Sequence, residues 1–225
     1  MTYQPHEFWQ SLLPPGTHDT DPPEGHADFY PASLPDGRQL ALPLRVLPGD
    51  GTMAVASLIL NQASFAVEDA LADALAGLLA PSRPEVIVGV PTLGLPLAAN
   101  VARRLGHARI VPLGTSRKFW YRDELSMPLK SITTPGGGKT LFLDPRMLPL
   151  LAGRRVAVID DVISSGQSMA SALGLLGKAG VTPVAIGCAM LQGEAWMSTL
   201  AANVREIVAP LRSPLLRKSG QNWRQ

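Results

Sequence analysis

Short apolar runs alternate with segments of helical periodicity from about residue 86 onward. Runs rich in Val, Ile, Ala and Leu predict strands buried on both faces, and apolar residues at three- and four-residue spacing predict helices between them. This alternation predicts an α/β fold with an open, mainly parallel sheet and helices on both faces. The predicted strands are 86–90, 110–113, 140–143, 156–159, 184–190 and 206–209, and the helices between them are 96–105 and 168–178.

The first part of the chain has a different pattern. Residues 1–35 are rich in Pro, Gly, Asp and His without an apolar period, which predicts an irregular extension on the surface. Two apolar segments, 38–46 and 53–60, flank a Pro-Gly-Asp-Gly turn and predict a hairpin. A helix is predicted to follow the N-cap residue Ser64. A chain of 225 residues can bury one large core, so 36–225 is expected to form a single domain.

Residues 156–168 combine a strand, two acids and a loop of small residues. An aliphatic run is followed by Asp160 and Asp161, then by Ser164, Ser165, Gly166, Gln167 and Ser168. Ligands of open α/β sheets bind at the carboxyl ends of strands, where this order places the acids beside the free N–H groups of a helix. An ordinary strand–helix turn with an acid near the helix N-terminus explains one carboxylate, but not a pair followed by so many hydrogen-bond donors.

The loop after the acids has the chemistry of a phosphate-binding site. The first N–H groups of the next helix lack partners, Gly166 can adopt a positive φ, and the serine hydroxyls can donate. Hydrogen bonds to a charged group contribute about 1.5–3 kcal/mol each. Carboxylates only accept hydrogen bonds, so Asp160 and Asp161 suit the hydroxyls of a sugar or a divalent cation. The segment therefore predicts a site for a 5-phosphorylated ribose.

The same segment resembles the 5-phosphoribosyl-1-pyrophosphate (PRPP) signature of the type I phosphoribosyltransferases. That signature has aliphatic residues, two acids, two aliphatic residues and a Ser/Thr-Gly loop, and every position from 156 to 168 is compatible with it. The resemblance implies that Asp160 and Asp161 are catalytic and contact the ribose hydroxyls, and that residues 164–168 hold the 5′-phosphate. It also implies a Mg²⁺ cofactor that is bound mainly through PRPP, with the two aspartates as the protein groups able to contribute.

A second loop follows the predicted strand 86–90 and consists of Pro91, Thr92, Leu93 and Gly94. It leads into a helix, and Gly94 allows backbone N–H groups to approach an anion closely. The corresponding loop of the family binds pyrophosphate, and the resemblance assigns that role to these residues. Many members of the family carry a basic residue where this chain has Leu93. The diphosphate would then be held through backbone amides and Thr92.

The stretch from Gly114 to Lys139 is long for a connection between strands, and such loops are commonly functional lids. Its cations and glycines suit a segment that closes over a departing diphosphate and excludes water. Arg117 and Lys118 resemble the start of the flexible loop of adenine and xanthine phosphoribosyltransferases, and the resemblance gives both a catalytic role. The aromatic residues either anchor the loop or stack on a substrate; they are Phe119, Trp120 and Tyr121.

Composition narrows the range of partners. The net charge is only +2 and 17% of the residues are charged, so the sequence does not predict the strong positive potential that favours binding of nucleic acid. The longest apolar stretch, 86–102, is broken by prolines and glycines, which favours a strand, loop and helix over a membrane span. The first residues lack the features of a signal peptide. The single cysteine, Cys188, is expected in the core and fits a reducing cytoplasm. Glu194 and Trp196 follow a strand end, where either substrate contact or an ordinary loop explains them.

Together with these patterns, the resemblance implies a Mg²⁺-dependent purine phosphoribosyltransferase. It transfers the 5-phosphoribosyl group of PRPP to a ring nitrogen of an adenine-like or xanthine-like base and releases pyrophosphate. No motif identifies the residues that bind the base. The alternative is a PRPP- or nucleotide-sensing protein on the same fold, since Leu93 replaces a basic residue. Hydrolysis of a phosphate ester ranks third because it leaves the acidic pair unexplained. The resemblance further implies a homodimer.

Overall fold

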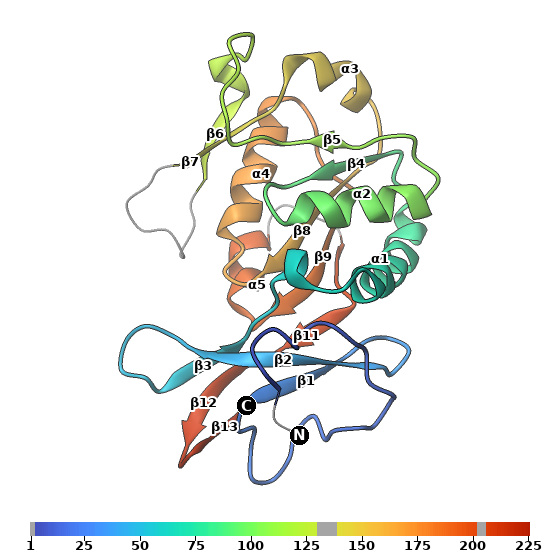
Figure 1. Cartoon of the computed structure of the whole chain (residues 1–225). Coiled ribbons are helices and arrows are strands. Elements are labelled where there is room, and N and C mark those ends of the chain that lie inside the picture. Colours follow the sequence, from blue (N-terminus) through green and yellow to red (C-terminus); the bar gives the residue numbers. More distant parts are fainter. Residues whose placement is uncertain (1–2, 130–138, 202–205) are drawn as a thin grey trace.

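The structure is a computed structural model that describes residues 3–129, 139–201 and 206–225. Its centre is a parallel sheet with strand order β10-β9-β8-β4-β5, in which β11 also pairs with β9 (Figure 1). The predicted α/β class with a parallel sheet is thus confirmed. The strands are β4 (Val86–Gly89), β5 (Val111–Pro112), β8 (Val156–Ile163), β9 (Ala185–Gln192), β10 (Ile207–Val208) and β11 (Leu211–Ser213).

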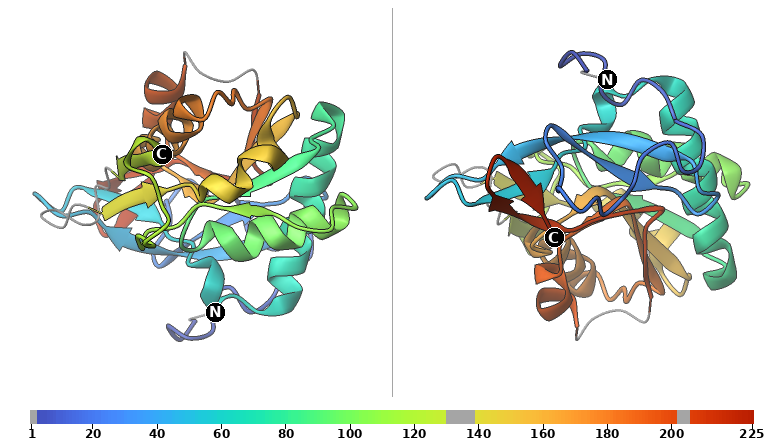
Figure 2. Two further views of the ribbon diagram at one scale, coloured as in Figure 1. Left: turned by 90° about the horizontal axis from the view of Figure 1, so that it is seen from above. Right: turned by 90° about the horizontal axis from the view of Figure 1, so that it is seen from below.

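Helices pack on both faces of this sheet (Figures 1 and 2). Successive side chains of a strand point to opposite faces. Accordingly, Ala157 and Ile159 of β8 join the core that contains α1 and α2, whereas Val156 and Val158 join the core that contains α4. Cys188 is fully buried in the second of these cores, as predicted. The helices are α1 (Phe65–Leu79), α2 (Gly94–Arg104), α3 (Leu148–Leu151), α4 (Gln167–Lys178) and α5 (Ala195–Leu200).

A second, antiparallel sheet joins the two ends of the chain and lies at one end of the central sheet (Figure 1). Its strand order is β1-β2-β3-β12-β13. The predicted hairpin is present as β2 and β3, which pair with each other. The strands are β1 (Phe29–Ser33), β2 (Gln39–Val46), β3 (Met53–Ala56), β12 (Leu215–Ser219) and β13 (Asn222–Arg224).

The N-terminal segment differs from the prediction in two respects. Residues 1–35 were expected to be irregular and superficial, but β1 pairs with β2 along its whole length, and Phe8 and Trp9 are buried in the core. The Trp9 indole N–H donates to the Ser57 carbonyl oxygen at 3.0 Å, so burial leaves it hydrogen-bonded. The burial of Trp9 depends on contacts with distant residues such as Ser57, which local composition does not reveal, whereas β1 pairs with the next strand along the chain. The division at residue 35 stays a prediction.

The strand predicted at 140–143 does not belong to the central sheet. It is observed as β7 (Lys139–Phe142), which pairs antiparallel with β6 (Ser126–Leu129) in a separate hairpin. Alternation of strands and helices suggested a parallel strand here, but no helix separates β6 from β7 within the described residues. The predicted lid therefore includes part of a hairpin. Its residues 130–138, among them Lys130 and the glycine run, lie outside the described residues.

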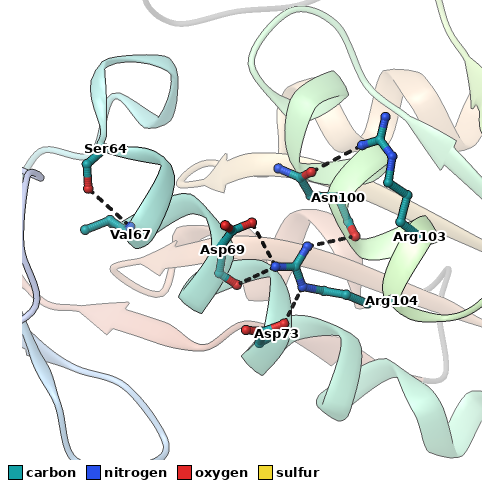
Figure 3. A network of polar contacts seen from close by, with 7 residues as sticks. All are labelled: Ser64, Val67, Asp69, Asp73, Asn100, Arg103 and Arg104. Atoms are coloured by element: carbon teal, nitrogen blue, oxygen red, sulfur yellow. Dashed lines mark hydrogen bonds and ion pairs between the residues drawn. The ribbon is translucent and has the colours of Figure 1, made fainter.

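Arg104 joins α2 to α1 (Figure 3). Its guanidinium donates to the Asp69 carboxylate at 2.8 Å and is also paired with the Asp73 carboxylate. It donates further to the backbone oxygens of Asp69 and Asn100, each at 3.2 Å. The Arg104 side chain is only 23% exposed, which limits screening of these contacts by water. Because α2 begins at Gly94, this arrangement helps to fix the helix that carries the second predicted loop.

Ser64 caps α1 as the sequence predicts. Its Oγ accepts the backbone N–H of Val67 at 3.3 Å and donates to the Gln10 carbonyl oxygen at 2.8 Å. One hydroxyl thus satisfies an unpaired helix N–H group and holds the N-terminal segment to the helix. Among the helices described over 3–129, 139–201 and 206–225, none is long and apolar enough to cross a membrane.

Replacing Ser64 by alanine should lower the free energy of unfolding by about 1 kcal/mol, the usual cost of losing an N-cap. Urea denaturation at neutral pH measures this change. Ser116→Ala is the matched control, because Ser116 is exposed, and we expect it to leave stability within about 0.5 kcal/mol of the parent. Equal stability of the two variants would show that the cap contributes nothing.

Candidate active site

The two predicted motifs meet at Gly94 and Asp160. A Cβ atom built on Gly94 would lie 2.7 Å from the Asp160 Cα and 3.0 Å from the Ile159 carbonyl oxygen. Only glycine therefore fits between α2 and β8 at this point without displacing backbone. The close approach places the end of the loop 91–94 directly against Asp160. The Pro91–Thr92 peptide bond in this loop is cis, and Thr92 is exposed while Leu93 is partly buried.

The two aspartates occupy different environments. Both belong to β8, which extends to Ile163, so the acids lie within the strand and not after its end as predicted. Asp160 is only 5% exposed, whereas Asp161 is partly exposed. Burial, together with the negative charge of Asp161, raises the pKa of Asp160 well above its usual range. Asp161 is thus the more accessible of the two carboxylates, and Asp160 lies against Gly94.

Asp160 is linked to its surroundings by a small number of contacts. Its Oδ1 accepts the backbone N–H of Asp161 at 2.9 Å. Its partner across the β8–β9 register is Cys188, a buried thiol that donates to the Met190 carbonyl oxygen at 3.2 Å. Burial raises the pKa of the Cys188 thiol, so this neighbour stays uncharged. An ionised Asp160 has no positive partner in this part of the described structure.

Replacing Asp160 by asparagine should stabilise the fold at neutral and alkaline pH. A carboxyl whose pKa is raised by folding stabilises the protein below its unfolded pKa, and this contribution is lost as the pH rises through the folded pKa. Asparagine has no such titration and keeps an oxygen for the Asp161 N–H. Thermal unfolding at pH 4 and pH 8 should show a gain in Tm for Asp160→Asn that is larger at pH 8.

Glu85→Gln is a control for which the expected change in Tm is opposite to that of Asp160→Asn. Glu85 accepts the backbone N–H of Arg155 at 3.0 Å and pairs with Arg154, and these contacts lower its pKa. Its contribution is present above the unfolded pKa and lost as the pH falls, so Glu85→Gln should lower Tm at pH 8 more than at pH 4. If Asp160→Asn changed Tm equally at pH 4 and pH 8, the inference that the buried Asp160 carboxylate destabilises the fold when ionised would be wrong.

The loop 164–168 has the geometry expected of an anion site. Gly166 adopts φ +79° immediately before α4, as the sequence predicts. Ser164 is exposed, Ser165, Gln167 and Ser168 are partly buried, and the Gln167 N–H reaches Ser165 Oγ at 3.4 Å. Within the described residues no side chain caps α4 at its N-cap, so N–H groups of its first turn are available to a ligand. Helix α5 covers this loop, with Thr199 and Leu200 beside Gly166.

The lid residues are not joined to the acids in this structure. The Arg117 guanidinium pairs with the Asp123 carboxylate within the same segment, and Lys118 is exposed. Among the described residues neither forms a hydrogen bond or ion pair with Asp160 or Asp161. The catalytic role predicted for Arg117 and Lys118 thus remains a prediction that requires this segment to move toward the acids.

The aromatic residues of the lid have separate environments. The Trp120 indole N–H donates to the Asp144 carboxylate at 3.2 Å, and the Arg146 guanidinium lies 4.5 Å from its ring centre. Arg146 also pairs with Asp144, and these contacts lower the pKa of Asp144 to about 2. Trp120 therefore anchors the segment. Phe119, in contrast, is 95% exposed.

The donor set suits a cation that arrives with a substrate. Mg²⁺ requires oxygen ligands, and Asp161 offers a partly exposed carboxylate. In the described ranges no group of three or more His, Cys, Asp or Glu residues is placed to hold a metal. A diphosphate and water could supply the other oxygen ligands of such a cation.

A parallel α/β sheet with an acidic pair, a donor-rich loop before α4 and a second loop packed on the acids defines a phosphoribosyl-binding protein of the type I phosphoribosyltransferase class. Comparison with known families agrees, because residues 57–208 match the family model described as "Phosphoribosyl transferase domain". The matched region is more than half of the chain, so the protein belongs to this family.

The alignments with curated relatives cover only part of this chain and part of each relative. The bifunctional protein PyrR of Mycolicibacterium paratuberculosis is 34% identical over 107 residues, which are 44% of this chain and 50% of the relative. Orotate phosphoribosyltransferase of Xanthomonas axonopodis pv. citri is 33% identical over 111 residues, which are 49% of this chain and 43% of the relative. The chain thus spans about half the length of the curated relatives it matches.

Solved structures share the fold. The APRTase of Giardia lamblia in complex with 9-deazaadenine aligns with a TM-score of 0.56 at 21% identity and covers 65% of this chain and 80% of that one. The adenine phosphoribosyltransferase of Thermoanaerobacter pseudethanolicus aligns with a TM-score of 0.55 at 19% identity and covers 65% and 81%. At these identities the likeness establishes the fold alone.

Sequence reasoning missed one concave region of the molecule. A cavity of about 570 Å³ lies between the end of β9 and the antiparallel sheet, and Tyr30 and Arg212 contribute to its wall. Neither residue belongs to a motif, and the strands that carry them are remote in sequence. Glu194 was noticed beside a strand end and also lines the cavity. Trp196 is buried, and its indole N–H donates to the Gly193 carbonyl oxygen at 2.9 Å.

Proposed function

We propose that the protein is a Mg²⁺-dependent phosphoribosyltransferase that transfers the 5-phosphoribosyl group of PRPP to a nucleobase, a purine of the adenine or xanthine type. The products are a nucleoside 5′-monophosphate and pyrophosphate. The contact of Gly94 with Asp160 carries this proposal, because it brings the predicted diphosphate loop and the predicted ribose-binding acids into one site. Family membership supports the same chemistry.

In this proposal each part of the site acts on a different part of PRPP. The N–H groups at the start of α4 and the hydroxyls of Ser164, Ser165 and Ser168 hold the 5′-phosphate, together with Gly166 and Gln167. Asp161 accepts hydrogen bonds from the ribose hydroxyls. Because substitution at the anomeric carbon develops positive charge on the sugar, the carboxylate also stabilises the transition state electrostatically.

The leaving diphosphate is held by the loop Pro91–Gly94. In this chain the loop supplies backbone amides and the exposed hydroxyl of Thr92, with no cation at Leu93. A Mg²⁺ ion bound to the diphosphate would partly neutralise the negative charge of the diphosphate. Closure of the segment with Arg117 and Lys118 would add positive charge and exclude water, so that the ribosyl group reacts with the base and not with solvent.

A PRPP- or nucleotide-sensing role is the second candidate. The observation in its favour is Leu93, which leaves the diphosphate loop without the basic side chain found in many members of the family. Such a protein would bind PRPP at the same acids and loop without turnover. We further propose that the protein acts in the cytoplasm as a homodimer, without nucleic acid or membrane as a partner.

Turnover with a panel of bases tests the proposal. The purified protein is mixed with PRPP, Mg²⁺ and each of adenine, hypoxanthine, xanthine, uracil and orotate, and pyrophosphate release is followed. We expect release that depends on one or more of the purines and stops when Mg²⁺ is chelated. Binding of PRPP by calorimetry without turnover of any base would favour the sensor.

A further inference from the structure

A further cavity lies on the N-terminal segment, outside the candidate active site. It encloses about 330 Å³, and its wall is formed by residues between 18 and 31. None of these residues belongs to the acidic pair or to the loops 91–94 and 164–168, and the wall shares no residue with the cavity at the end of β9. The proposed transfer reaction therefore leaves this cavity without a role.

Backbone contacts hold this segment on β13. The His26 N–H donates to the Trp223 carbonyl oxygen at 2.7 Å, and the Trp223 N–H donates to the His26 carbonyl oxygen at 2.8 Å. The Asn222 side-chain amide donates to the Glu24 carbonyl oxygen at 3.0 Å. The cavity is thus bounded by a segment whose backbone is already ordered, which limits the conformational entropy lost when a ligand binds.

The charged side chains of the wall are acidic. Asp19, Glu24 and Asp28 line the cavity, and among the described residues its wall includes no lysine or arginine. Within the same ranges none of the three carboxylates forms an ion pair. Arg224 donates to the Pro23 carbonyl oxygen and is not part of the wall. The negative charge of the wall favours a positively charged ligand.

A buried imidazole is the second polar feature of the wall. His26 lines the cavity, is only 6% exposed, and its Nε2 has no hydrogen-bond partner in the described part of the chain. Burial lowers the pKa of His26, so its imidazole is neutral at pH 8. A hydrogen bond to the Thr20 backbone opposes this shift in pKa, as do the charges of the nearby acids Asp21, Asp19 and Glu24. That hydrogen bond places the proton on Nδ1 and leaves Nε2 as an acceptor, and a buried polar atom without a partner usually indicates a ligand or water.

The three carboxylates and the imidazole nitrogen share one property, because all four groups accept hydrogen bonds and none donates. An ammonium group is the complement, with three donors, a positive charge and no acceptor. A bare metal ion is a poorer match, since no group of three or more His, Cys, Asp or Glu in the described ranges is placed to hold one. The wall also contains Phe29, whose partly exposed ring can contact an alkyl chain or a cation.

We propose that this cavity binds a small organic cation with a primary ammonium head. The ammonium donates to the carboxylates of Asp19, Glu24 and Asp28 and to Nε2 of His26, and the alkyl part lies against Phe29. A volume of about 330 Å³ is sufficient for a small molecule of this kind. The inference goes beyond the proposed function and does not depend on it.

Titration calorimetry of the full chain with two amines tests the site. At pH 8 butylammonium is protonated, and we expect it to bind at one saturable site. Butyltrimethylammonium carries the same charge but has no N–H group, so its Kd should be at least tenfold higher, as expected when charge-assisted hydrogen bonds are lost. Equal affinity for the two cations, or no saturable binding of butylammonium, would overturn the proposal, because attraction to surface acids alone does not require a donor.

Variants of the wall locate the binding site. Glu24→Gln and Asp28→Asn should each raise the Kd for butylammonium by about tenfold, the expected loss of one charge-assisted hydrogen bond. Glu124→Gln is the matched control, since Glu124 is an exposed glutamate that does not line the cavity, and it should leave the Kd unchanged. Nitrogen NMR should show the His26 Nε2 resonance shift during the titration. An unchanged Kd in both wall variants, or a fixed Nε2 resonance, would overturn the site and leave the proposed transferase function intact.

Discussion

Replacing Asp160 and Asp161 together by asparagine should lower kcat/KM for nucleotide formation by about 10²–10⁴-fold. A hydrogen bond to a charged group contributes about 1.5–3 kcal/mol, and two of them lost at the ribose correspond to this range. Asparagine preserves the shape of each side chain, so the fold should persist. Initial rates of pyrophosphate release at PRPP concentrations below KM measure the loss, and thermal unfolding reports on the fold.

The single variants separate the two roles. Asp161 is the partly exposed acid, so Asp161→Asn should account for most of the loss in rate. Asp160→Asn should combine a smaller kinetic defect with a higher Tm at pH 8, because it removes a buried charge. Near-normal turnover of the double variant would refute the assignment of these acids to the ribose.

Replacing Gly94 by alanine should reduce kcat/KM by about 100-fold. The added Cβ would lie 2.7 Å from the Asp160 Cα and 2.9 Å from its Oδ1, so the loop 91–94 or the strand has to shift. A displacement of about 1 Å at a positioning element can cost roughly 10² in rate. Overpacking against backbone should also lower the free energy of unfolding by about 1–3 kcal/mol.

Gly77→Ala is the control for this substitution. Gly77 lies within α1, and a Cβ atom there would meet nothing within 4 Å. Alanine in a helix interior should stabilise the protein by about 0.5–1 kcal/mol and leave the rate unchanged. If Gly94→Ala and Gly77→Ala behaved alike in the kinetic assay, the proposed link between the diphosphate loop and the acids would be wrong.

The local patterns of the sequence predicted most strands of the central sheet and several local features of the candidate site. The segment 156–168 could be interpreted because its informative residues are close together in the sequence. They are a buried apolar run, two acids and a glycine that adopts a positive φ. Ser64 likewise caps α1 as expected, because capping depends on residues within one helical turn. Because β4 and β8 are parallel neighbours, the loops that follow them lie at the same edge of the sheet. The sequence did not predict that Gly94 would lie in direct contact with Asp160.

Features that depend on distant residues escaped prediction. The antiparallel sheet pairs β3 with β12, and the predicted surface extension contributes Phe8 and Trp9 to the core. Residues 140–143 read as a strand, but the pattern could not distinguish a parallel partner from the antiparallel partner β6. Arg212 and Tyr30 lacked any local signal, since the cavity forms only when both ends of the chain fold together.

The most direct measurement of the central claim is phosphorus NMR of PRPP incubated with the protein, Mg²⁺ and each of adenine, hypoxanthine and xanthine. The proposed function predicts loss of the PRPP signals and stoichiometric growth of signals from pyrophosphate and a nucleoside 5′-monophosphate, only when the base is present. Conversion of PRPP to ribose 5-phosphate and pyrophosphate regardless of the base would identify a hydrolase and contradict the account.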